Sequence, residues 1–158
     1  MQESHPLFGE LEYDDYEGYI TKTVVAFSGQ EKEIELVISE TNGNGGIEKE
    51  HCEAYEAMLA NWDNIVPDVL QAIIEYQNEH WDDTDHTQSY PKFKTVEDVL
   101  ENVELISIRI EAQPHEYLEI EGRFIVLLFS AEWVNNDYRL LSVALVNEKV
   151  IHVTDQDI

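Results

Sequence analysis

The sequence contains few basic residues. It has 9 lysines and arginines against 34 aspartates and glutamates in 158 residues, which gives a formal net charge of −25 at pH 7. Nucleic acids and anionic membranes carry charge of the same sign, so binding to them would gain nothing from counterion release. The composition therefore argues against direct binding to DNA, RNA or a membrane surface, and favours a basic protein as the partner.

Cysteine and long apolar runs are also scarce. Cys52 is the single cysteine, so no internal disulfide can form, and a lone thiol fits a reducing compartment. The first residues, MQESHPLFGELEYDD, lack the basic start and the apolar run of a secretory signal, and no segment has the apolar length needed to span a bilayer. We therefore expect a soluble, cytoplasmic protein. The length and the hydrophobic fraction of 43% predict a single domain over residues 1–158.

The common catalytic and nucleotide-binding motifs are missing. The glycine-rich stretch TNGNGG at 41–46 lacks the Lys-Ser/Thr of a phosphate loop, and no Gly-x-Ser-x-Gly, paired-His helix or Cys-x-x-Cys occurs. His51 and Cys52 are neighbours on a predicted helix, where adjacent side chains do not face each other. The other histidines outside the 78–86 stretch, His5, His115 and His152, stand alone. We expect no catalytic residue and no cofactor.

The densest run of potential metal ligands is NEHWDDTDH at 78–86. His80, Asp82 and His86, with Asp83 or Asp85 as alternatives, have the side chains that bind Zn²⁺ or Mn²⁺. Their spacing matches no recognised ligand pattern, and the glycine of a calcium loop is missing. We predict a solvated acidic loop with Trp81 packed against the domain, and the alternative is a metal-dependent domain or enzyme that uses residues 80–86.

The hydrophobic period changes twice along the chain. Residues 7–39 alternate as half-buried strands do, and FGELEY, YITKTVVAF and KEIELVIS are three candidate strands. Residues 47–79 have a helical period, and Pro67 predicts a break near Trp62 that divides this segment into two helices.

A capping-box pattern, Thr95 with Asp98, predicts a short helix in TVEDVLENV, and the chain after residue 103 alternates as strands again. We therefore predict an α+β fold. An antiparallel sheet from the N- and C-terminal strands would have two central amphipathic helices packed on one face.

The distribution of charge suggests where a partner would bind. No lysine or arginine occurs between Lys49 and Lys92, whereas acidic residues are frequent there. If the helices bury their apolar sides, Glu50, Glu53, Glu56 and Asp68 should remain exposed. Tyrosine and tryptophan beside aspartate offer apolar area, hydrogen bonds and charge together. The predicted partner-binding residues are Tyr13, Asp14, Asp15, Tyr16, Trp81, Asp82, Asp83 and Asp85.

Three segments carry a resemblance to a known family. HPLFGELEYDDYEGYI at the start, EAYEAMLANWDNIVPDVLQAIIEY in the middle and FSAEWVNNDYRLLSVALVNEKVIHVTD at the end resemble a bacterial family of small acidic domains of unknown function. Its members commonly carry Trp-Asp-x-Glu-His-Gly where this chain has Trp133-Val134-Asn135-Asn136-Asp137-Tyr138, so a role of that Glu-His pair would be lost here. In size and acidity the family resembles immunity proteins that neutralise a toxin.

The resemblance implies a non-enzymatic binding module that neutralises a basic toxin or nuclease partner. A homo-oligomeric acidic scaffold, whose charge serves solubility alone, is a further alternative.

Overall fold

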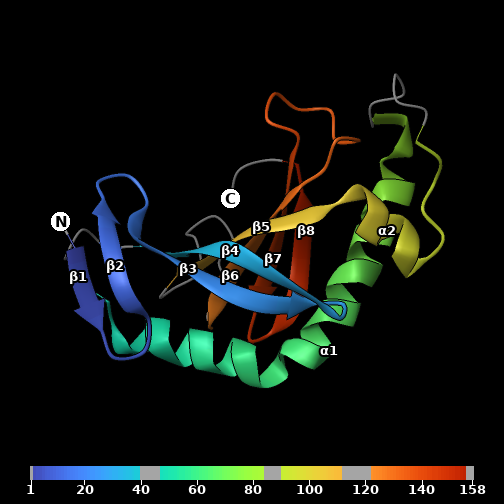
Figure 1. The fold of residues 1–158 in the computed structure, drawn as a ribbon. Helices are drawn as coiled ribbons and strands as arrows, with labels where there is room; N and C mark the ends of the chain where they lie inside the picture. The colour runs from blue at the N-terminus through green and yellow to red at the C-terminus, as the bar shows by residue number, and fades with distance from the viewer. Residues whose placement is uncertain (1, 40–46, 84–89, 112–121, 156–158) are drawn as a thin grey trace.

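The structure, a computed structural model, describes residues 2–39, 47–83, 90–111 and 122–155 (Figure 1). Its strands form one eight-stranded sheet in which neighbours along the chain are neighbours in space. The strands are β1 (Gln2–His5), β2 (Gly9–Asp14), β3 (Gly18–Phe27), β4 (Gln30–Ile38), β5 (Glu104–Glu111), β6 (Phe124–Ser130), β7 (Leu140–Val146) and β8 (Lys149–Thr154). The helices are α1 (Lys49–Glu79), the 3-10 turn η1 (Trp81–Asp83) and α2 (Val96–Asn102).

The predicted fold is wrong in its sheet and in its helices. Strands β4 and β5 pair in parallel, with Leu36 opposite Ile108, so the sheet is mixed rather than antiparallel. The connection between two parallel strands must cross from one end of the sheet to the other, and α1 and α2 make this crossing. The protein is a strand-rich fold around one large mixed sheet. Residues 47–79 contain one helix and not the two that were predicted.

Helix α1 continues through the predicted break. It has 31 residues and includes Pro67, whose side chain is exposed. Figure 1 shows α1 running below the sheet and then turning upward, and an interior proline, which removes one backbone hydrogen bond, is an ordinary cause of such a bend. Trp62, near the expected break, is buried and donates a hydrogen bond from Nε1 to the carbonyl oxygen of Ala26 at 2.6 Å.

Two local predictions are confirmed. Helix α2 begins with the expected capping box, in which Thr95 Oγ1 accepts from the amide of Asp98 at 3.2 Å and Asp98 Oδ2 accepts from the amide of Thr95 at 3.0 Å. Strands follow residue 103, as predicted. Before residue 40 there are four strands rather than three, because β1 pairs with β2 across a turn that ends at Gly9.

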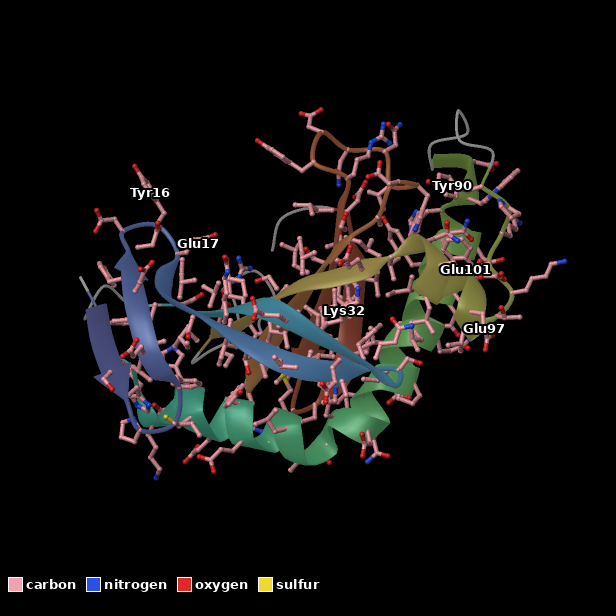
Figure 2. The ribbon with its side chains drawn as sticks, in the orientation of Figure 1. Tyr16, Glu17, Lys32, Tyr90, Glu97 and Glu101 are labelled. Carbon is pink, nitrogen blue, oxygen red and sulfur yellow. The ribbon has the colours of Figure 1, made fainter. Side chains whose placement is uncertain are left out.

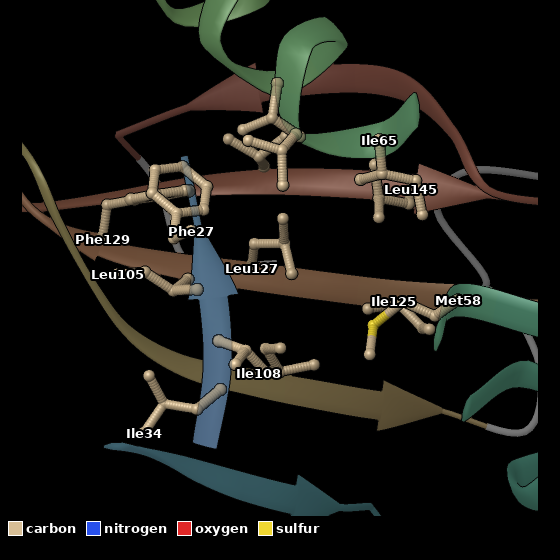
Figure 3. Packing of buried hydrophobic residues seen from close by; sticks show 14 of the residues in the cluster. Phe27, Ile34, Met58, Ile65, Leu105, Ile108, Ile125, Leu127, Phe129 and Leu145 are labelled. Atoms are coloured by element: carbon tan, nitrogen blue, oxygen red, sulfur yellow. The ribbon is translucent and has the colours of Figure 1, made fainter. Parts of the chain in front are cut away.

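The core lies between α1 and one face of the sheet. Figure 3 shows Met58 and Ile65 of α1 facing Ile108, Ile125, Leu127 and Leu145 of the sheet, and all six belong to one continuous buried cluster. Phe124, Val126, Ala144 and Val146 alternate with these residues and form a smaller buried cluster on the other face of β6 and β7. No helix in the described ranges is long and apolar enough to cross a membrane.

Candidate functional site

The predicted partner-binding residues lie in two separate places. Residues 13–16 end β2 and begin the turn to β3, whereas Trp81 and Asp82 lie in η1. Figure 2 shows Tyr16 at one end of the molecule and Tyr90, whose carbonyl oxygen accepts from Trp81 Nε1 at 3.0 Å, at the other. The structure does not bring the two groups together, and Asp85 lies outside the described residues.

The β2–β3 turn is organised by one aspartate. Asp14 Oδ1 accepts hydrogen bonds from the amides of Tyr16 at 2.8 Å and Glu17 at 3.0 Å, which fixes the backbone of the turn. The ring of Tyr13 packs against Tyr19 with centroids 5.2 Å apart. Of these predicted residues, Asp15 and Tyr16 project into solvent, and Tyr16 is 97% exposed.

The second predicted group contains one anchored aromatic side chain. Trp81 is half-buried, as expected of a residue packed back on the domain, and Lys92 Nζ lies 5.7 Å from its ring centroid. Asp82 is exposed, and Asp83 is the last residue of η1. Among the candidate metal ligands, the ring of His80 packs on Tyr76 at 4.5 Å, and His86 lies outside the described residues. Within the described ranges, no three His, Cys, Asp or Glu side chains form a group that could hold a metal ion.

The thiol of Cys52 lies near a histidine that sequence reasoning treated as isolated. Cys52 Sγ is 4.0 Å from His5 Nε2, whereas the imidazole of His51 contacts the backbone of Glu48 and Ser39. Burial raises the pKa of the Cys52 thiol, and the carboxylates of Glu56 and Glu53 raise it further. This environment disfavours the thiolate, so the pair has no activated nucleophile.

The outward face of α1 is acidic. The carboxylates predicted to remain outside, Glu50, Glu53, Glu56 and Asp68, are exposed, which confirms that prediction. Asp63, Glu75 and Glu79 are also exposed, and the single basic residue of the helix, Lys49, pairs with Glu53 at 3.5 Å. Leu59, 46% exposed, interrupts this face with apolar surface.

Acidic residues also lie near the C-terminus of α1, where negative charge destabilises a helix. The C-terminus of an α-helix carries a partial negative charge, and basic residues there are stabilising. The last turn of α1 has no basic residue, and Glu75 and Glu79 lie near this end. The negative field of the helix C-terminus and the negative field of these carboxylates therefore reinforce each other.

A groove runs between the C-terminal half of α1 and strand β8, and sequence reasoning did not anticipate it. It consists of two adjoining hollows of about 540 and 290 Å³, which share Tyr76, His80, His152 and Val153. We call it the β8 groove. The first hollow is lined by Asp68, Gln71, Ala72, Glu75, Tyr76, Glu79, His80 and residues 150–153. The second is lined by Tyr76, His80, Trp133, Val134, Asn135 and residues 152–155.

Residues 133–135 form one end of this groove. Trp133 is fully buried, donates from Nε1 to the carbonyl oxygen of Asn102 at 3.1 Å, and meets the ring of Phe93 edge-on. Val134 is buried beside it, while Asn135 is exposed. Trp133 thus has a core position, and Val134 and Asn135 line the second hollow of the groove, whereas Asn136, Asp137 and Tyr138 line a separate hollow.

Comparison with known families identifies the domain. A family model described as Domain of unknown function (DUF6985) matches residues 7–158. The chain belongs to this family. The match confirms the resemblance to a domain family of unknown function. The matched residues include the middle and closing segments that carried the resemblance, and the opening segment from Leu7 onward. No curated protein and no solved structure matches the chain.

Proposed function

We propose that this DUF6985 domain is a non-enzymatic binding module for a basic protein, such as a toxin or nuclease domain that it neutralises. The observation that supports the proposal best is the outward face of α1. Its exposed carboxylates extend along a helix of 31 residues, about 45 Å, and Lys49 is the one lysine or arginine within that helix.

Four of the nine basic residues of the chain pair with carboxylates outside α1. Lys22, Lys32, Arg109 and Arg123 pair with carboxylates on the sheet or its turns, at Glu33, Glu104, Glu111 and Glu148. Their nearest carboxylates therefore lie outside α1, and much of the helix charge is left to act on the surroundings. A field of one sign speeds the encounter with an oppositely charged partner by about tenfold or more at low ionic strength.

The acidic end of α1 supports a role in binding rather than in solubility alone. Solubility requires net charge, which any exposed position would supply. Glu75 and Glu79 instead lie where the helix dipole makes carboxylates unfavourable. A local arrangement that opposes stability is more often found where a surface serves a function.

The test begins with the natural partner, captured from the source cell with the tagged domain and identified. Association and dissociation rates are then measured at low and high salt. We expect a basic partner whose association rate falls steeply with salt, because exposed charges are screened over about 8 Å at physiological ionic strength. Capture of an acidic partner, or rates that do not respond to salt, would contradict the proposal.

Two matched variants locate the surface. The triple variant Asp63→Lys, Asp68→Lys, Glu75→Lys changes the outward face of α1. The control, Glu10→Lys, Glu12→Lys, Glu31→Lys, makes the same change in net charge at exposed positions of β2 and β4. We expect the first variant to slow association by about tenfold at low salt, and the control to slow it much less. Equal effects would mean that net charge alone matters, which favours the solubility alternative.

A further inference from the structure

Strand β8 is the last strand of the sheet in the part of the chain that the structure describes. In the strand order, β8 follows β7 and pairs with no other strand in the described ranges. A strand with one neighbour leaves backbone N–H and C=O groups along its second edge, and an extended segment of another chain can pair with them.

The two edges of this sheet differ in how well they are protected. Strand β1 has four residues and is followed at once by Pro6, which limits further pairing. Strand β8 has six residues, KVIHVT, without proline and with one charged residue, Lys149, at its start. A register shift opposite Ala144 and Leu145 leaves Ile151 as an extra residue in β8, 38% exposed and in the wall of the β8 groove.

Helix α1 lies beside β8 and makes this edge one wall of a groove. Figure 1 shows the C-terminal half of α1 rising next to β8, and the two elements are in contact. The hollow of about 540 Å³ between them is open to solvent. Tyr76 and His80 line both this hollow and the second one, so the two are continuous.

The walls of the groove select the charge of its occupant. Asp68, Glu75 and Glu79 from α1 line the first hollow, and Asp155 lines the second. No lysine or arginine is among the described residues that line either hollow. The apolar side chains of Val150 and Ile151 lie among these carboxylates, so a segment that alternates basic and apolar residues fits both.

We propose that the β8 groove binds an extended basic segment of a partner protein, which pairs with β8 as a ninth strand and directs lysine or arginine side chains to Asp68, Glu75 and Glu79. The inference rests on the proposed function, since it assigns to the basic partner a specific mode of recognition. Backbone pairing supplies affinity in this mode, and the carboxylates supply selectivity for charge.

A synthetic peptide of alternating lysine and valine, seven residues long, tests the mode directly. Its first control has the same sequence with every backbone amide N-methylated, which keeps the charge and blocks strand pairing on both edges. Its second control replaces lysine by glutamate. We expect the lysine peptide to bind at least tenfold more tightly than either control. We also expect it to slow amide hydrogen exchange in residues 150–153.

Variants of the domain give a second readout. Asp68→Asn, Glu75→Gln, Glu79→Gln should weaken binding of the lysine peptide by at least tenfold. The matched control Glu10→Gln, Glu12→Gln, Glu31→Gln should change the affinity for this peptide by no more than about twofold. These conservative substitutions are all at exposed positions, and a circular dichroism melt verifies that each variant is folded.

The outcomes separate this inference from the proposed function. If the N-methylated peptide binds as well as the parent, or β8 gains no protection from exchange, strand addition is wrong, and a salt-dependent basic partner can still be captured. If the lysine peptide does not bind at all at low salt, the β8 groove is not the site for a basic segment, and the proposal of a basic partner still stands on its own test. If the captured partner is acidic, the proposed function fails, and the inference fails with it.

Discussion

The imidazole of His51 donates a hydrogen bond from Nε2 to the carbonyl oxygen of Ser39 at 2.7 Å, which ties the first turn of α1 to the end of β4. Its Nδ1 accepts from the amide of Glu48 at 2.9 Å, so one ring nitrogen carries the proton and the other does not. The ring is fully buried. A second proton would break the contact with Glu48.

This relationship predicts a pH dependence of stability. Burial lowers the pKa of His51 below its ordinary value of 6.5. As pH falls below about 6.5, the unfolded chain binds a proton at this position before the folded chain does, so the free energy of unfolding decreases with falling pH. This decrease continues until the pH reaches the lowered pKa.

Urea unfolding at pH 7 and about pH 5.5, compared between the wild type and His51→Gln, measures the effect. The variant should lose about 1–3 kcal/mol at pH 7 because backbone groups lose their partner. The gap between the two proteins should then narrow as pH falls. A difference in the free energy of unfolding that stays constant with pH would show that His51 does not titrate as described. The carboxylates are the same in both proteins, so their contribution cancels in this difference.

Gln77 should be among the least replaceable polar residues of α1. It is fully buried, donates from Nε2 to the carbonyl oxygen of Pro91 at 2.9 Å, and accepts at Oε1 from the amide of Phe93 at 2.8 Å. Gln77→Leu keeps the volume and leaves both backbone groups without this partner, which costs about 1–3 kcal/mol. Chemical denaturation measures this loss. Gln71→Leu, at an exposed position of the same helix, is the control and should change stability by less than about 0.5 kcal/mol.

The β7–β8 turn combines backbone strain with an ion pair. Asn147 and Glu148 have φ of 49° and 64°, and the carboxylate of Glu148 receives hydrogen bonds from Arg123 Nε at 2.7 Å and Nη2 at 2.8 Å. Glu148→Ala removes the pair, and since Arg123 is partly exposed the loss should be about 1 kcal/mol.

Glu148→Gly removes the same ion pair but adopts positive φ without strain. It should therefore be more stable than Glu148→Ala by up to about 1 kcal/mol. The comparison is made by thermal denaturation of the two variants side by side. An alanine variant that equals or exceeds the glycine variant would show that the turn backbone is not strained at this residue.

Pro67 should limit the stability of α1. Its ring removes one hydrogen bond inside the helix, so Pro67→Ala should raise the free energy of unfolding by about 2 kcal/mol, after allowance for the more flexible unfolded chain. Asn64→Ala, at an exposed position one turn earlier, should change it by less than about 0.5 kcal/mol. No gain from Pro67→Ala would mean that the bend is needed to keep α1 against the sheet.

Local patterns in the sequence were sufficient for several parts of the fold. The capping box of Thr95 and Asp98 acts within four residues, and the helix begins where that pattern predicts. The exposure of Glu53, Glu56 and Asp68 follows from the apolar stripe of α1, because burying that stripe leaves its opposite side in water. The single helix could not be predicted. The cost of Pro67 depends on neighbouring residues alone, whereas the packing that offsets it involves strands distant in sequence, β3 and β5–β8.

By itself, the sequence determined the charge of this protein, the alternation of its strands, the capped start of α2 and the acidic outward face of α1. The charge is a sum over the composition, and each of the other features depends on residues within a few positions of one another. The tertiary structure alone decided that β4 and β5 run in parallel, that residues 13–16 and Trp81 lie far apart, and that β8, which pairs with β7 alone among the described strands, lies beside the acidic end of α1. The alternation of a strand is the same whether its neighbour is parallel, antiparallel or absent, so these pairings are settled when distant segments pack around a common core.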